Sequence, residues 1–200
     1  MTENTKDKIL GFAHKLFAEK GFTGVSVREI AKICGCNIAA INYHFTNKEN
    51  LYLQTMQHSI ERTEVDIKAI FDSMVEKDID LFALKVFDHF LQNGEDLRTG
   101  FKLILSNSDI PSKIPIDTSR FKGPPGGEYF DFCLREQFPQ TIDSDIDWAV
   151  RTIFTQVIHK SLILCNKELC SKLLSEDKPE EVMRSDISRV IKMVKRELNS

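Results

Sequence analysis

The 200-residue sequence has no long apolar run, which excludes a protein that crosses a membrane by helices. Its first residues, MTENTKDKIL, are polar and hold no signal-peptide core, so we expect a cytoplasmic protein without a membrane partner. Catalytic signatures are also missing: there is no phosphate-binding glycine motif, no HExxH and no GxSxG. We therefore expect a protein that is not an enzyme and that needs no cofactor or metal.

Cysteine is scarce, and its five copies are irregularly spaced. An odd number of cysteines does not suit a secreted disulfide framework, and no second pair stands at zinc-binding spacing. Cys34 and Cys36 leave two interpretations open. They are either a redox or metal pair, together with His14 or His44, or a small core residue beside a partly exposed thiol.

Charge is nearly balanced, with a net value of −3. Its distribution is uneven, because residues 1–50 hold seven Lys/Arg against five Asp/Glu, whereas the remainder is acidic. A mildly basic N-terminal part on an acidic remainder suits a protein that touches nucleic acid at one end only.

Helical periodicity runs through the chain and predicts an all-α protein of about nine helices. The first helix is expected over residues 6–20. Two short helices follow, around a turn that contains glycine. Ser26 is placed to cap one that ends at Gly35, and Asn37 is placed to cap the next, over residues 38–45. Such a pair fits a helix-turn-helix unit that reads DNA.

The second short helix carries the DNA-binding interpretation. Ala40, Ile41 and Phe45 can pack inward at helical spacing. The remaining side chains could then face a DNA groove and contact bases or phosphates: Ile38, Ala39, Asn42, Tyr43 and His44.

The segments GF, SVREIA, AAINYHF and NKE-x-L, in this order and spacing, resemble the N-terminal signature of the tetracycline-repressor (TetR) family of transcriptional regulators. The resemblance covers roughly residues 9–53. It implies a homodimer that binds a palindromic operator in double-stranded DNA, with the last two helices as the dimer interface and an unidentified small molecule as effector. By family position, the DNA contacts would come from Ser26, Arg28, Ala39, Ala40, Asn42, Tyr43, His44 and Lys48. Ile38 and Asn42 depart from common family choices, which leaves the operator sequence open.

The rest of the chain is expected to form a helical regulatory domain over residues 48–200, after a DNA-binding domain over 1–47. Its first helix runs from Lys48 to about Val75 without proline or glycine. Further helices are expected over these ranges: 79–92, 96–107, 128–138, 143–174 and 179–198. The loop over residues 108–127, rich in proline and glycine, is either a portal over a pocket or a plain connection.

Phenylalanine is abundant, with fourteen copies against three tyrosines and one tryptophan. The copies in the second part of the chain form either a packed core or an apolar ligand pocket with a few polar groups. The candidate pocket residues are Phe87, Phe90, Phe101, Phe130, Phe154, His89, Tyr129 and Gln156. Two alternatives to a regulator stay open: a helical adaptor for a protein partner, and a ligand carrier or enzyme that uses this pocket.

Overall fold

The computed structural model describes residues 5–93, 99–102, 123–173 and 178–200. Within these ranges the chain forms helices and connecting turns and holds no strand, which confirms the predicted all-α class. None of the described helices is long and apolar enough to cross a membrane. The chain divides into two compact units, unit 1 with residues 1–62 and 98–120, and unit 2 with residues 63–97 and 121–200. The predicted functional boundary at residue 47 stays a prediction.

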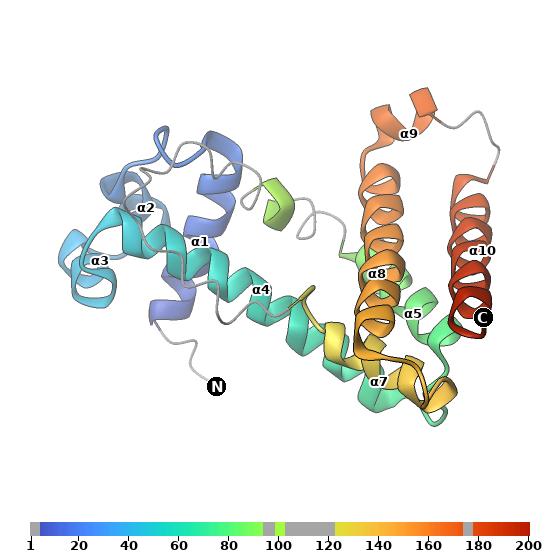
Figure 1. The fold of residues 1–200 in the computed structure, drawn as a ribbon. Helices are drawn as coiled ribbons and strands as arrows, with labels where there is room; N and C mark the ends of the chain where they lie inside the picture. The colour runs from blue at the N-terminus through green and yellow to red at the C-terminus, as the bar shows by residue number, and fades with distance from the viewer. Residues whose placement is uncertain (1–4, 94–98, 103–122, 174–177) are drawn as a thin grey trace. The chain divides into compact units, whose positions relative to one another are not determined.

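Unit 1 is built on three helices and the start of a fourth (Figure 1). These are α1 (Thr5–Lys20), α2 (Val27–Cys34), α3 (Ile38–Phe45) and α4 (Lys48–Ser73). The three short helices pack on one another, and Leu51 and Tyr52 of α4 are fully buried in the same apolar cluster. The Tyr52 ring packs edge-on against Phe17 and Phe22, with ring centroids 4.9 and 5.3 Å away. The small apolar set of α1 to α3 is thus completed by α4.

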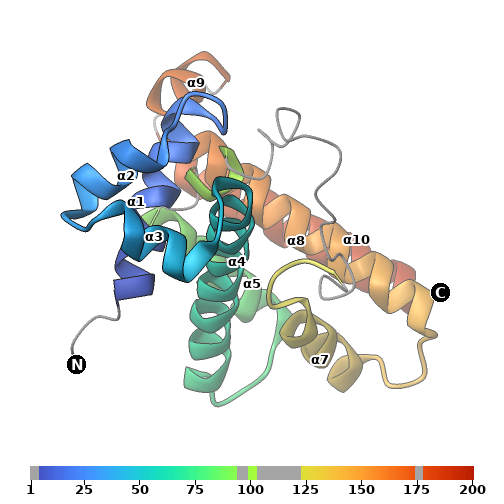
Figure 2. The ribbon, with the colours of Figure 1, turned by 90° about the vertical axis from the view of Figure 1, so that its left-hand side faces the viewer.

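Unit 2 is a helical bundle centred on α8 (Asp143–Cys165). In this unit α8 lies between α7 (Gly127–Gln137) and α10 (Pro179–Leu198) and runs antiparallel to α10 (Figure 1 and Figure 2). Helix α5 (Ile79–Gln92) packs against α7, α8 and α10, and α9 (Lys167–Leu173) follows α8. The buried side of α10 is an apolar stripe at helical spacing, with Met183, Ile187 and Ile191 among its buried residues.

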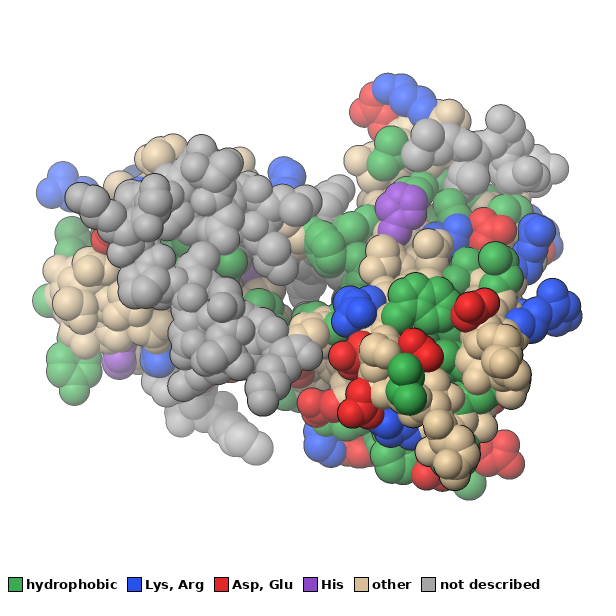
Figure 3. Space-filling view, in the orientation of Figure 1, with side chains coloured by type: hydrophobic (Ala, Val, Ile, Leu, Met, Phe, Trp, Pro, Cys, Tyr) green, Lys and Arg blue, Asp and Glu red, His purple; other side chains and the backbone are tan. Residues whose placement is uncertain are grey.

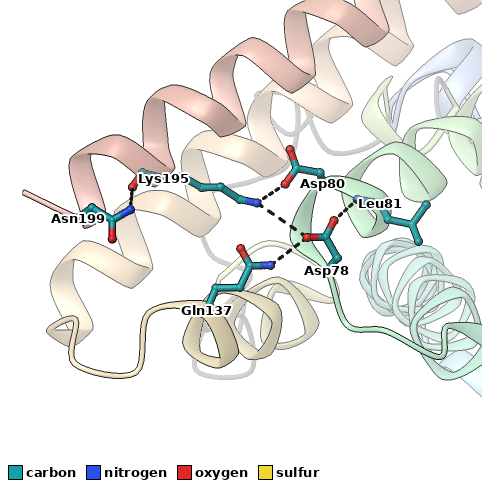
Figure 4. A network of polar contacts seen from close by, with 6 residues as sticks. All are labelled: Asp78, Asp80, Leu81, Gln137, Lys195 and Asn199. Carbon is teal, nitrogen blue, oxygen red and sulfur yellow. Dashed lines mark hydrogen bonds and ion pairs between the residues drawn. The ribbon is translucent and has the colours of Figure 1, made fainter.

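Polar contacts fix the ends of these helices in unit 2. Asp78 caps α5 by accepting a hydrogen bond from the backbone N–H of Leu81 at 2.9 Å. Its other carboxylate oxygen accepts a 3.1 Å hydrogen bond from Gln137 of α7 and lies 3.9 Å from the Lys195 ammonium of α10 (Figure 4). Lys195 also pairs with Asp80. The network therefore joins α5, α7 and α10.

Two expectations about the long C-terminal helix were wrong. The predicted helix over residues 143–174 is two helices, because Asn166 has extended backbone and its side chain accepts a hydrogen bond from the backbone N–H of Leu169 at 3.1 Å. The sequence also predicts Asp143 or Ser144 as the cap of this helix, and neither residue caps α8. The cap position is Ile142, without a side-chain bond, and Asp143 stands in the first turn, where its charge suits the helix dipole.

Other predicted elements were confirmed within a few residues: those over 6–20, 27–34, 38–45, 48–75, 79–92, 128–138 and 179–198. The helix expected over 96–107 is described only at residues 99–102, which are helical. Most of the loop expected over 108–127 lies outside the described residues, so its two interpretations stay open.

Candidate nucleic-acid interface

The helix-turn-helix begins at a tight turn between α1 and α2. At Gly24 a Cβ atom would lie 2.2 Å from the backbone oxygen of Lys20, so only glycine fits this approach of the two chain segments. Ser26 then caps α2, its hydroxyl accepting a 3.1 Å hydrogen bond from the backbone N–H of Glu29. The Glu29 carboxylate pairs with Lys20, which lowers the pKa of Glu29 and raises that of Lys20. This ion pair, which the sequence did not predict, ties α2 to the end of α1.

The turn between α2 and α3 is set by two predicted residues. Gly35 takes the left-handed conformation, with φ of 71°, and its N–H donates to the carbonyl of Ala31. Asn37 caps α3, its side-chain oxygen accepting a 2.6 Å hydrogen bond from the backbone N–H of Ala40. Both ends of the turn are therefore held by local hydrogen bonds, which gives α3 a defined starting point.

Helix α3 presents the predicted surface. Ile41 and Phe45 are buried in the unit 1 core, and Ala40 is half-buried. The exposed side chains are Ile38, Ala39, Asn42 and Tyr43. Tyr43 is 85% exposed, although a large aromatic side chain gains free energy from burial. Figure 3 shows hydrophobic side chains at the surface over α2 and α3, where Ile33 is also exposed.

His44 and the next turn complete this surface. His44 is half-buried, and its ring lies between Tyr43 and Phe45, with centroids 5.2 and 6.0 Å away. Thr46, which ends α3, has φ of 63°, a conformation uncommon for a β-branched residue. Asn47 then caps α4, accepting a 2.8 Å hydrogen bond from the backbone N–H of Asn50. The sequence predicts this cap, because an asparagine stands directly before the helix expected to start at Lys48, and the cap is confirmed, whereas nothing in the sequence marked Thr46.

Lys48, in the first turn of α4, has a defined position. Its ammonium nitrogen lies 4.4 Å from the centroid of the Phe22 ring, within the range of a cation–π contact. Phe22 is itself held by the core, next to Phe17 and Tyr52. Sequence reasoning missed this positioning role of Phe22, because the two residues stand far apart in the chain. Arg28 is exposed on α2, near the capping Ser26 in sequence.

Half of the eight candidate pocket residues are packed in the core. Phe87, Phe90, Phe130 and Phe154 are at most 8% exposed. Phe130 lies 5.8 Å from Phe154, centroid to centroid, with the rings edge-on. A ligand that touches these rings has to displace packed side chains or enter a space that opens on binding.

The polar pocket candidates and Phe101 are less buried than these four rings, although the His89 ring contacts Phe90, with ring centroids 5.9 Å apart. His89 is half-buried, with its Nε2 atom 3.3 Å from an Asp66 carboxylate oxygen. Tyr129 is half-buried beside Phe71, and burial is the main cause of the raised pKa of its hydroxyl. Gln156 is half-buried on α8. Phe101 belongs to unit 1, whereas the other candidates belong to unit 2, so the eight residues do not form one site within either unit.

Metal binding finds no support in the described part of the chain, where no group of three or more His, Cys, Asp or Glu side chains could hold an ion. In particular, neither His14 nor His44 joins the two cysteines in such a group. His14 instead lies 3.3 Å from the Ser59 hydroxyl of α4.

Residues 9–55 match the family model of the bacterial regulatory proteins of the tetR family. This match covers α1 to α3 and the first turns of α4, which are the elements of the candidate interface. Residues 9–55 of the chain form an N-terminal domain of the TetR family. Members of this family bind DNA, usually as dimers.

Individual relatives agree with this assignment over the N-terminal part. YttP of Bacillus subtilis (strain 168) is 48% identical over 60 residues, which are 30% of this chain and 27% of YttP. The HTH-type transcriptional regulator QacR of Staphylococcus aureus (strain Mu50 / ATCC 700699) is 42% identical over 53 residues, 26% of this chain and 28% of QacR. The chain thus matches little more than a quarter of the length of these relatives.

Solved structures extend the likeness of fold to nearly the whole chain. A TetR transcriptional regulator from Legionella pneumophila has a TM-score of 0.66 at 21% identity, covering 96% of this chain and 100% of that one. A tetR-family regulator from Streptomyces coelicolor has a TM-score of 0.65 at 14% identity, covering 98% and 85%. At these identities the likeness concerns the fold alone.

Proposed function

We propose that this TetR-family chain is a transcriptional repressor that binds a palindromic operator as a homodimer and is released by a small apolar or aromatic ligand. The observation that carries the DNA-binding part is helix α3, which is capped at Asn37, anchored by Ile41 and Phe45, and exposed at Asn42 and Tyr43. An α-helix of this kind fits the major groove, where amide side chains pair with base edges. A DNA-binding role on the chromosome would also place the protein in the bacterial cytoplasm.

The proposed contacts divide by chemistry. Asn42, Tyr43 and His44 would read bases, because they carry hydrogen-bonding groups on the exposed helix, whereas Ile38, Ala39 and Ala40 would make apolar contact with the groove. The backbone contacts would come from Ser26, Arg28 and Lys48. Lys48 is suited to a phosphate, because the Phe22 ring holds its charge near the start of α4.

A second copy of the chain would dock on α8 and α10. These helices pack together in unit 2, and each keeps one large apolar side chain outward: Trp148 is 41% exposed and Met193 is 67% exposed. Burial of such side chains on a matching surface favours association. The resulting four-helix contact would hold two α3 helices for two half-sites.

Release by a ligand requires a conformer with lower operator affinity. A ligand shifts the population by its differential affinity for that conformer, commonly by about 1–3 kcal/mol. Helix α4 is continuous from Lys48 to Ser73 and contributes residues to both units, so it is the proposed path of the coupling. The pocket would form around the phenylalanines of unit 2, such as Phe130 and Phe154, with His89, Tyr129 or Gln156 orienting the ligand.

The test is selection from a pool of random-sequence DNA duplexes, followed by sedimentation of the complex. The proposal predicts enrichment of one inverted repeat and a complex that contains two chains per duplex or a multiple of two. Adaptor and enzyme functions both predict no enrichment. A pool whose sequences remain random after repeated rounds of selection would overturn the DNA-binding function. A complex with one chain per duplex would overturn the dimer.

A further inference from the structure

Two thiols meet in the turn of the helix-turn-helix. Cys34 ends α2 and is buried, and Cys36 follows two residues later and is half-buried. Their Sγ atoms are 2.9 Å apart, with the Cys34 thiol donating a hydrogen bond to Cys36. Gly35 between them has φ of 71°, and this turn of the chain lets the two side chains face each other. The proposed DNA contacts use neither sulfur.

We propose that Cys34 and Cys36 form a reversible disulfide that lowers the DNA affinity of unit 1, with a peroxide as the oxidant. The inference rests on the proposed DNA-binding function for its consequence, but not for the chemistry. It assigns a redox input to unit 1, in addition to any ligand input.

The separation of the sulfurs favours the bond. Disulfide sulfurs lie about 2.05 Å apart, so Cys34 and Cys36 need to approach by less than 1 Å. The partial exposure of Cys36 gives an oxidant access to one sulfur, while Cys34 is 2% exposed and is shielded from it. One sulfur can therefore react first and the other resolve the product.

The reaction has two steps. The Cys36 sulfur attacks one oxygen of hydrogen peroxide, so that an S–O bond forms and the O–O bond breaks. The products of this step are a sulfenic acid at Cys36 and one water molecule. The Cys34 sulfur then attacks Cys36, forming the S–S bond and breaking the S–O bond, and the hydroxide leaves as a second water with the Cys34 proton. Two thiols are oxidised by two electrons and one peroxide is reduced. A dithiol reverses the bridge by exchange.

The bridge would act on the start of α3. Cys34 is packed in the unit 1 core, so the approach of the sulfurs falls mainly on Cys36. The backbone N–H of Cys36 donates to the carbonyl of Ala31 at 3.0 Å, and the next residue, Asn37, is the cap of α3. A shift at Cys36 therefore disturbs both the end of α2 and the cap that orients the recognition helix.

The environment makes the switch slow at neutral pH. Burial is the main cause that raises the pKa of the Cys36 thiol to about 11, and the charge of Lys8 opposes it. The thiolate is the reactive form, so the rate of oxidation should rise about tenfold per pH unit well below that pKa. Such a pair would respond to sustained peroxide exposure and ignore brief pulses.

The test treats the purified full chain with hydrogen peroxide at pH 8 and then measures the mass of the peptide that holds both cysteines. We expect this peptide to lose two hydrogen atoms and dithiothreitol to restore them. On a duplex selected by the reduced protein, the oxidised form should bind about tenfold or more weakly, as for the loss of one base contact. Cys36→Ser should keep its affinity under peroxide, and Cys170→Ser, a matched change of a half-buried thiol in unit 2, should respond as the unchanged chain does.

Several results would overturn the proposal. They are a peptide whose mass does not change, a bridge that leaves DNA affinity unchanged, and a Cys36→Ser variant that still loses affinity. If the reduced protein selects no duplex, the DNA-binding function has failed, and the mass still reports whether the bridge forms. Amide hydrogen exchange in α3 is then the second readout, and exchange that is equal in both redox forms would refute the switch without any DNA.

Discussion

Replacement of Lys48 by Met tests the phosphate contact proposed for the start of α4. The substitution keeps a long apolar side chain beside Phe22 and removes the charge, which lies 4.4 Å from the ring centroid. Each phosphate neutralised by a protein contributes about 0.9 to the slope of log affinity against log salt concentration. A dimer with two Lys48 contacts should therefore lose about 1.8 from the magnitude of this slope. When salt is raised from 50 to 200 mM, the affinity of the variant should consequently fall by a factor roughly 12 times smaller than that of the unchanged chain.

The assay is fluorescence anisotropy of a selected duplex over that salt range. Lys85→Met is the matched control, because Lys85 is an exposed lysine of α5 in unit 2, and its slope should equal that of the unchanged chain. Phe22→Leu separates position from charge: the slope should stay, while affinity should fall because a cation–π contact of about 0.5–1 kcal/mol no longer orients each lysine. An unchanged slope for Lys48→Met would refute the assignment.

Three further predictions concern stability. Ser26→Ala removes the cap bond to Glu29 and should lower the free energy of unfolding by about 1 kcal/mol in urea titrations, and no loss would mean that the cap is unimportant. Burial raises the pKa of the Cys133 thiol to about 12, so the folded chain keeps a proton that the unfolded chain releases near its ordinary pKa of 9.0. The free energy of unfolding should therefore fall by at most about 4 kcal/mol as pH rises from that value toward 12. Cys133→Ala should remove this part of the alkaline loss, and an equal loss in both proteins would contradict the assignment. Lys195→Met breaks the ion pair with Asp80 and should lower the melting temperature of unit 2 by a few degrees. High salt should diminish this effect, and a salt-independent change would point to packing instead.

The sequence predicted the helices of unit 1 well because their ends carry local signals. Ser26, Gly35, Asn37 and Asn47 each act within three or four residues of chain, where a hydrogen bond or a left-handed turn decides the boundary. At Asn166 the apolar pattern continues through the break, so periodicity alone gave one long helix. The ability of the Asn166 side chain to cap a new helix was the signal in the sequence that could have predicted the break.

Contacts between distant residues were beyond the sequence. The Lys20–Glu29 pair and the Phe22–Lys48 contact depend on how α1, α2 and α4 fold against one another. The same limit applies to the ligand site, since a phenylalanine at helical spacing suits a packed core and a pocket equally. The exposure of α3 was predictable, because Ile41 and Phe45 at i and i+4 fix its inner face and leave Tyr43 outside.

Replacement of Tyr43 by Ala tests most directly whether α3 reads DNA. Tyr43 is 85% exposed, so its removal should leave folding and the dimer intact. The affinity for the selected duplex should fall by about 30-fold or more, since contacts to a base are worth about 1–3 kcal/mol each and the dimer loses two. Tyr129→Phe, a tyrosine change in unit 2, should bind as the unchanged chain does. Equal affinity of Tyr43→Ala and the unchanged chain, with both proteins dimeric, would contradict the account of α3 as the recognition helix.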